Sequence, residues 1–133
     1  MIEIFYKKDG QIMVSQSETD LSSITYEDVV WIDLFVPSGE EKRAVESFLG
    51  TVIQNRAQAE EIEISSRFYE TERAIFANTS FLIPGPDEYN EETVSFILTD
   101  EILTTLRECP LKSFTDLQRR MLAFPKMYDS GHV

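Results

Sequence analysis

Hydrophobic and polar residues alternate along the first third of this chain in a way that predicts β-strands. Residues 2–7 (IEIFYK) alternate, and residues 11–16 (QIMVSQ) follow after the pair Asp9–Gly10. A period of two is typical of a half-buried strand, and Asp-Gly is a frequent hairpin turn. Residues 29–35 (VVWIDLF) are apolar except for Asp33, which indicates a central strand covered on both faces.

The periodicity then changes to that of helices. Ser38 and Glu41 have the spacing of a capping box, and apolar residues recur at helical intervals from Ala44 to Leu49. Gly50 is a typical C-terminal cap. A second, shorter helix is predicted over residues 54–65, although its isoleucines are also compatible with the start of a strand.

The second half of the chain predicts further strands and one last helix. Residues 85–92 have the composition of a turn, Asp100 marks a tight hairpin, and Ser113 is expected to cap a helix ending near residue 124. The expected strands cover residues 66–73, 74–84, 93–99 and 101–108. This order predicts an α/β (α+β) fold in which a mixed β-sheet is covered by helices, as one domain over residues 1–133.

Composition narrows the possible partners. The chain has 133 residues, 24 acidic against 12 basic side chains, and a formal net charge of -12. Such a polyanion repels nucleic acid and anionic lipid head groups and attracts cations, so we expect no nucleic-acid partner. The single cysteine, Cys109, permits no disulfide within the chain. We find no signal peptide and no window of about 20 apolar residues, so we expect a soluble segment without direct membrane insertion.

Catalytic equipment is sparse, and we expect no enzyme. The only histidine, His132, is the penultimate residue, and the glycines form no phosphate-binding loop. Carboxylates are the abundant group. They cluster at Glu60, Glu61 and Glu63, and again at Asp87, Glu88, Glu91 and Glu92. Carboxylate oxygens are ligands that Mg²⁺ prefers, but acidic groups also occur as ordinary solvated surface, and both interpretations remain open here.

Three motifs in the same order resemble the amino-terminal cytoplasmic domain of CorA-type divalent-cation transporters. The first is WIDLFVPSGEEKRAVESFLG at residues 31–50, the second is SSRFYETERAIFANTSFLIP at 65–84, and the third is ETVSFILTDEILTTLRECPLKSFTDLQRRM at 92–121. Together they cover most of residues 29–122. Residues that carry the likeness include Trp31, Asp33, Pro37, Arg67, Tyr69, Glu70, Val94, Phe96, Thr105, Arg107, Phe114 and Arg119.

The resemblance implies an αβα sandwich on the cytoplasmic face of the cell membrane. In the family this domain continues into a stalk helix and two membrane helices, and the protein assembles as a homopentamer that transports Mg²⁺ or Co²⁺. This chain would then be a fragment that contributes to ion sensing, gating and assembly. On its own we expect a monomer or weak association.

The resemblance also assigns a regulatory divalent-cation role to Glu60 and Glu61. They stand at the acidic positions of a family motif whose His-Pro pair is absent here, with Asn55 and Arg56 nearby instead. We expect weak Mg²⁺ binding and no tightly bound cofactor. Two alternatives stay open, a free-standing acidic protein-interaction module of the same fold and a small hydrolase with a carboxylate site.

Overall fold

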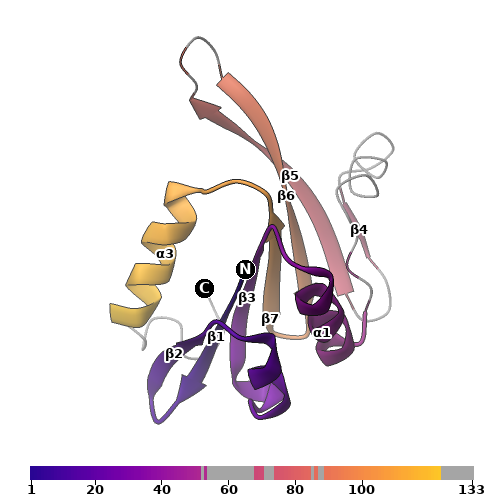
Figure 1. Cartoon of the computed structure of the whole chain (residues 1–133), viewed down its shortest axis with the longest axis vertical. Helices are drawn as coiled ribbons and strands as arrows, with labels where there is room; N and C mark the ends of the chain where they lie inside the picture. The colour runs from indigo at the N-terminus through magenta and orange to yellow at the C-terminus, as the bar shows by residue number, and fades with distance from the viewer. Residues whose placement is uncertain (52, 54–67, 71–73, 85, 87–88, 124–133) are drawn as a thin grey trace.

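The computed structural model describes residues 1–51, 53, 68–70, 74–84, 86 and 89–123. They form a seven-stranded mixed sheet with the order β2-β1-β3-β7-β6-β5-β4 (Figure 1). Neighbouring strands are antiparallel except β3 and β7, which are parallel. The strands are β1 (Ile2–Lys8), β2 (Gln11–Ser15), β3 (Val29–Phe35), β4 (Phe68–Glu70), β5 (Ala74–Pro84), β6 (Tyr89–Thr99) and β7 (Ile102–Arg107).

Two α-helices and two short 3₁₀-helices accompany the sheet in the described part of the chain. The α-helices are α1 (Gly39–Leu49) and α3 (Lys112–Ala123), and the 3₁₀-helices are η1 (Glu18–Ser22) and η2 (Tyr26–Asp28). The capping box of α1 is confirmed, because Ser38 Oγ accepts from the Glu41 amide at 3.1 Å and Glu41 Oε1 accepts from the Ser38 amide at 2.9 Å. Gly50 ends α1 in the left-handed conformation at φ 73°, as predicted.

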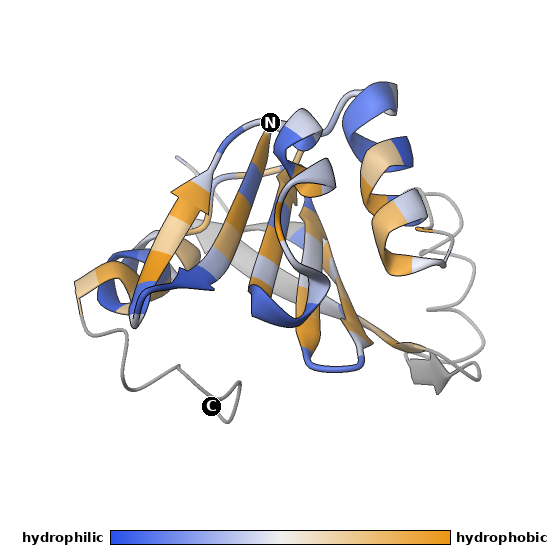
Figure 2. Ribbon diagram, turned by 90° about the horizontal axis from the view of Figure 1, so that it is seen from below, coloured by the Kyte–Doolittle hydropathy of each residue, from blue (hydrophilic) through white to orange (hydrophobic). Residues whose placement is uncertain are grey.

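The two helices cover opposite faces of the sheet and create two cores. Val45 and Leu49 of α1 pack in one cluster with Ile32, whereas Phe114 of α3 packs in another with Trp31. Because successive strand residues point to opposite faces, adjacent Trp31 and Ile32 serve different cores. Burying one such side chain stabilises the fold by about 1.5–3 kcal/mol. The expected mixed sheet between helices is confirmed, and Figure 2 shows hydrophobic positions recurring along the strands.

Positive φ angles occur at the turn between β1 and β2 and at the end of β3. Asp9 and Gly10 have φ values of 52° and 76°, the two positive angles of a type I′ hairpin turn. At the end of β3, Val36 has φ 42°, an unfavourable angle for a β-branched residue. Its amide donates to the Arg107 carbonyl at 2.9 Å, which holds the chain in this conformation as it leaves the sheet for α1.

The amino-terminal ammonium group binds at the same corner. It donates to the Phe35 carbonyl at 2.8 Å and to Glu41 Oε1 at 3.1 Å. Partial burial raises the pKa of Glu41, but hydrogen bonds from Ser38 and the nearby ammonium charge outweigh it, and the pKa lies below its ordinary value of 4.5. Glu41 therefore ties the first strand to the start of α1.

Two details differ from the sequence-based expectations. Residues 85–92 do not form one turn, since β6 begins at Tyr89 and pairs with β5 as far as Pro84. Helix α3 begins at Lys112, so Ser113 lies inside it and is not its cap. The long partner strand β5 explains the first difference, because pairing overrides the low strand propensity of Asn and Glu. The helix predicted over 54–65 lies outside the described residues.

Thr104 supplies a first test of this packing. Its hydroxyl and that of Thr99 are buried and have no hydrogen-bond partner among the described residues, whereas the adjacent Thr105 hydroxyl donates to Asp33. An unsatisfied buried hydroxyl is destabilising by about 1–3 kcal/mol. We expect Thr104→Val to raise the free energy of unfolding by about 1 kcal/mol and the matched Thr105→Val to lower it by about 1–3 kcal/mol, measured by urea denaturation. Equal losses in both variants would contradict this account.

Candidate functional site

The two residues predicted to bind a regulatory cation, Glu60 and Glu61, lie outside the described residues, so their role remains a prediction. The second acidic group is only partly described. Glu91 and Glu92 belong to β6, opposite Leu82 and Phe81 of β5, while residues 87 and 88 are outside the described part. Among the described residues, no group of three His, Cys, Asp or Glu side chains could hold a metal ion.

One acidic surface does gather residues from distant segments. Glu27 of η2 and the β6–β7 turn residues Asp100 and Glu101 line an open hollow together with Tyr26. The Tyr26 hydroxyl donates to Asp100 Oδ2 at 2.7 Å. This bond holds the β6–β7 turn against the segment before β3. We therefore interpret the hollow as the surface of a structural contact and not as a binding site.

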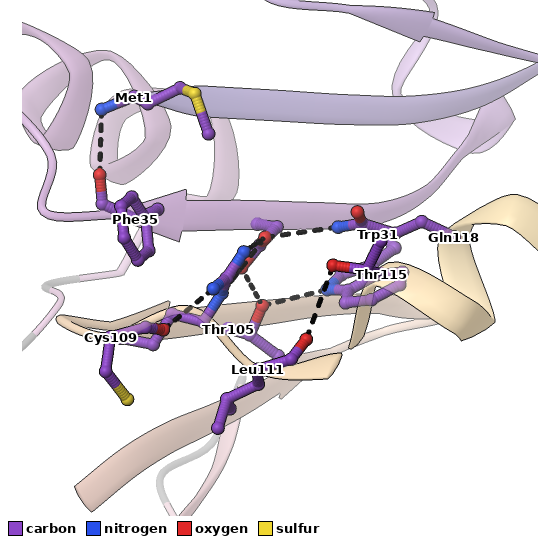
Figure 3. A network of polar contacts seen from close by, with 10 residues as sticks. Met1, Trp31, Phe35, Thr105, Cys109, Leu111, Thr115 and Gln118 are labelled. Atoms are coloured by element: carbon purple, nitrogen blue, oxygen red, sulfur yellow. Dashed lines mark hydrogen bonds and ion pairs between the residues drawn. The ribbon is translucent and has the colours of Figure 1, made fainter. Parts of the chain in front are cut away.

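The most elaborate polar arrangement lies inside the molecule, around Asp33 and Arg107 (Figure 3). Arg107 Nη2 donates to Asp33 Oδ2 at 2.8 Å, and its Nε lies 3.2 Å from both carboxylate oxygens. The side chain of Asp33 is 0% exposed and that of Arg107 is 6% exposed. The two residues sit on β3 and β7, the parallel pair at the centre of the sheet. An ion pair this deeply buried requires further hydrogen bonds to compensate for lost hydration.

Neighbouring side chains supply these bonds to the carboxylate. Thr105 Oγ1 donates to Asp33 Oδ1 at 2.8 Å and itself accepts from Trp31 Nε1 at 2.9 Å. Gln118 of α3 donates to Asp33 Oδ2 at 3.1 Å. Both oxygens of Asp33 therefore accept from donors on strand β7 and helix α3, which leaves the carboxylate poorly placed to act as a general base or as a metal ligand.

The guanidinium group is enclosed equally well. Arg107 Nη1 donates to the Cys109 carbonyl at 2.8 Å, and the guanidinium carbon lies 4.6 Å from the Phe35 ring centroid and 5.3 Å from that of Phe114. Aromatic faces attract a cation and shield it from water. The Trp31 ring extends this aromatic cluster, with its centroid 5.5 Å from that of Phe114 and 5.3 Å from that of Phe5. The network thus joins β1, β3, β7 and α3.

Sequence reasoning noted Asp33 as an interruption of an apolar strand, and noted Asp33 and Arg107 separately as matches to the family pattern, but did not pair the two residues. The available signal was the charge itself, because a carboxylate within a strand covered on both faces needs a cationic partner. Arg107 lies at the end of another apolar strand, 74 residues away. Single-sequence patterns do not reveal which of the twelve basic residues is that partner.

Comparison with known proteins shows that nearly the whole chain is similar to one group of sequences. The magnesium transport protein CorA of Wolinella succinogenes is 31% identical over 137 aligned residues, covering 99% of this chain. The chain is a CorA relative over almost its entire length. The CorA protein of Salmonella typhimurium is 36% identical over 115 residues, covering 86% of this chain. These alignments cover 43% and 35% of the two relatives, so the chain spans less than half of their length. Models of known protein families give no match.

Solved CorA structures share the fold. The complete CorA magnesium transporter of Methanocaldococcus jannaschii superposes on 95% of this chain with a TM-score of 0.65 and 14% identity, using 38% of that chain. The soluble domain of CorA from the same organism superposes with a TM-score of 0.62 and 16% identity over 91% of this chain and 46% of that one. In the described part of this CorA relative, no helix is long and apolar enough to cross a membrane.

The Asp33–Arg107 pair can be tested with a double-mutant cycle. Arg107→Met leaves a buried carboxylate without its cation and should lower the free energy of unfolding by about 3–5 kcal/mol. Asp33→Leu combined with Arg107→Met removes both charges, so the double variant should lose less than the sum of the two single variants. Arg119→Met, at an exposed position of α3, serves as the control and should change stability by less than about 0.5 kcal/mol. Additive losses in urea denaturation would refute the coupling.

Proposed function

We propose that this chain is the cytosolic regulatory domain of a CorA-like transporter for divalent cations such as Mg²⁺ or Co²⁺. The observation that carries the proposal is the match of 99% of the chain to a magnesium transport protein at 31% identity. Since less than half of that relative is matched, ion permeation belongs to the rest of a longer protein. This domain then contributes to ion sensing, gating and assembly at the cytoplasmic face of the cell membrane.

The sheet offers a surface on which such a longer protein could continue. Ile75 and Leu98 are cross-strand partners on β5 and β6 and are 36% and 41% exposed. Leu98 also pairs with Leu103, which packs on the side of the sheet that α3 covers. The matched part makes up 46% of the solved CorA soluble domain, so more than half of that domain lies beyond it. We infer that this remaining soluble polypeptide covers the exposed pair.

Charge supports the sensing role. A net charge of -12 raises the local concentration of cations, and clustered carboxylates repel one another until a divalent ion lies between them. An ion shifts a conformational equilibrium only by its different affinity for the two states. In the homopentamer that we propose for the longer protein, Glu60 and Glu61 would bind the ion most strongly when neighbouring copies bring their acids together.

The alternatives are weaker. A hydrolase would need an accessible carboxylate or nucleophile with an activating partner, and the buried carboxylate of the described part, Asp33, already accepts bonds at both oxygens. A free-standing interaction module of the same fold would share the sheet but would not respond specifically to divalent ions. The ion titration below separates this module from the proposed sensor.

Mg²⁺ titration of the chain, followed by two-dimensional NMR at constant ionic strength, tests the sensing role. We expect weak binding with half-saturation at about 1 mM, the order found for loosely built carboxylate sites. The variant Glu60→Gln/Glu61→Gln should weaken binding about tenfold, and Glu27→Gln/Glu101→Gln, which removes the same charge from a different surface, should weaken it less than twofold. Equal losses in the two variants would indicate a diffuse ion atmosphere and contradict an Mg²⁺ role for the pair.

A further inference from the structure

Strand β2 forms one edge of the sheet in the described part of the chain. It has β1 on one side and no strand on the other within the described residues. Its residues Gln11–Ser15 carry no charge and no proline, and its pairing with β1 runs without a bulge. Met13 and Val14 are 40% and 38% exposed. An edge strand presents a row of free backbone donors and acceptors, and most proteins protect such an edge with lysine, proline or a bulge. Figure 2 shows β2 as the outer, mostly hydrophobic strand on the left.

The two ends of β2 carry opposite charge. Lys7 and Lys8 lie beside the hairpin turn at the Gln11 end, where Asp9 offsets one of them. At the other end the chain enters η1, whose first turn contains Glu18 and Asp20. Ser15 Oγ donates to Asp20 Oδ2 at 2.5 Å, which fixes this acidic segment next to the end of the strand. This edge has no charge along its length, but basic residues lie at one end and acidic residues at the other. It therefore favours one orientation of a partner strand.

We infer that β2 pairs antiparallel with β2 of a second copy of this chain. A two-fold axis near Met13 places the Gln11 end of each strand against the Ser15 end of the other. The basic end of each copy, which carries Lys8 on β1 opposite Gln11, then faces the acidic end of its partner, which leads to Glu18 of η1, so the attraction between unlike charges occurs twice. Parallel pairing would bring the two basic ends together and the two acidic ends together, which is unfavourable.

Helix α3 extends the same contact on one face of the sheet. Met121 of α3 packs in one cluster with Ile12 of β2, and the next helix residue, Leu122, is 45% exposed. Antiparallel pairing of the β2 strands brings the two α3 helices toward each other and covers apolar surface beside the new strand pair. Because the contact is small and each copy carries a charge of -12, the dimer is weak. This inference does not depend on the proposed transporter function.

Reversing the charge at Lys8 or at Glu18 by mutation tests the orientation of the two β2 strands directly. Sedimentation velocity over a concentration series should show a reversible monomer–dimer equilibrium for the chain. Lys8→Glu and Glu18→Lys should each weaken dimerisation about tenfold, because each turns both symmetric contacts from attraction into repulsion. An equimolar mixture of the two variants should regain wild-type affinity, since every contact in the mixed dimer again joins unlike charges.

Matched controls separate this contact from the effect of net charge. Arg43→Glu and Glu101→Lys make the same changes in charge at exposed positions away from β2, and they should shift the dissociation constant less than threefold. Met13→Lys should abolish the dimer, while its circular dichroism reports whether the monomer remains folded. The inference fails if the chain stays monomeric at all concentrations, or if the mixture associates no better than either variant alone.

Discussion

The buried ion pair between Asp33 and Arg107 constrains the rest of the structure. A carboxylate at 0% exposure is tolerated only because Arg107, Thr105 and Gln118 all donate to it. These donors come from β7 and α3, so the pair fixes both the parallel junction at the centre of the sheet and the position of the helix over it. A pair between residues 74 positions apart forms only when the two halves of the sheet have met. Its geometry therefore favours one arrangement of the strands over alternatives that would leave an unpaired charge in the core.

The same interaction divides the molecule into a neutral interior and an acidic exterior. Asp33 and Arg107 cancel each other, and the aromatic rings of Phe35 and Phe114 enclose the cation. In the described part of the chain these two residues are the only buried charged side chains, so the other described acids lie at least partly at the surface, where a divalent ion can reach them. In our proposal the rigid sheet positions acidic segments, and the ion acts at those segments rather than within the described core.

Much of the fold could be predicted from local patterns, because those patterns are set by residues close in sequence. The hairpin at Asp9–Gly10 and the capping box at Ser38 and Glu41 depend on chain geometry over a few residues, and both are confirmed. Longer-range features were harder. The extension of β6 to Tyr89 depends on its partner β5, and α3 begins at Lys112, one residue before the predicted cap. Asp33 could be recognised as unusual, but its partner is defined only by the parallel pairing of β3 and β7. The predicted cation ligands Glu60 and Glu61 lie outside the described residues.

The central claim is that α3 is held on the sheet by the buried pair, through Gln118. Native-state hydrogen exchange of the chain and of Gln118→Leu measures this at each amide. The account predicts that amides of α3 lose protection by about tenfold or more in the variant, since a hydrogen bond to a charged group contributes about 1.5–3 kcal/mol. Amides of the β1–β2 hairpin should keep a larger share of their protection. Wild-type protection throughout α3 in the variant would contradict the account.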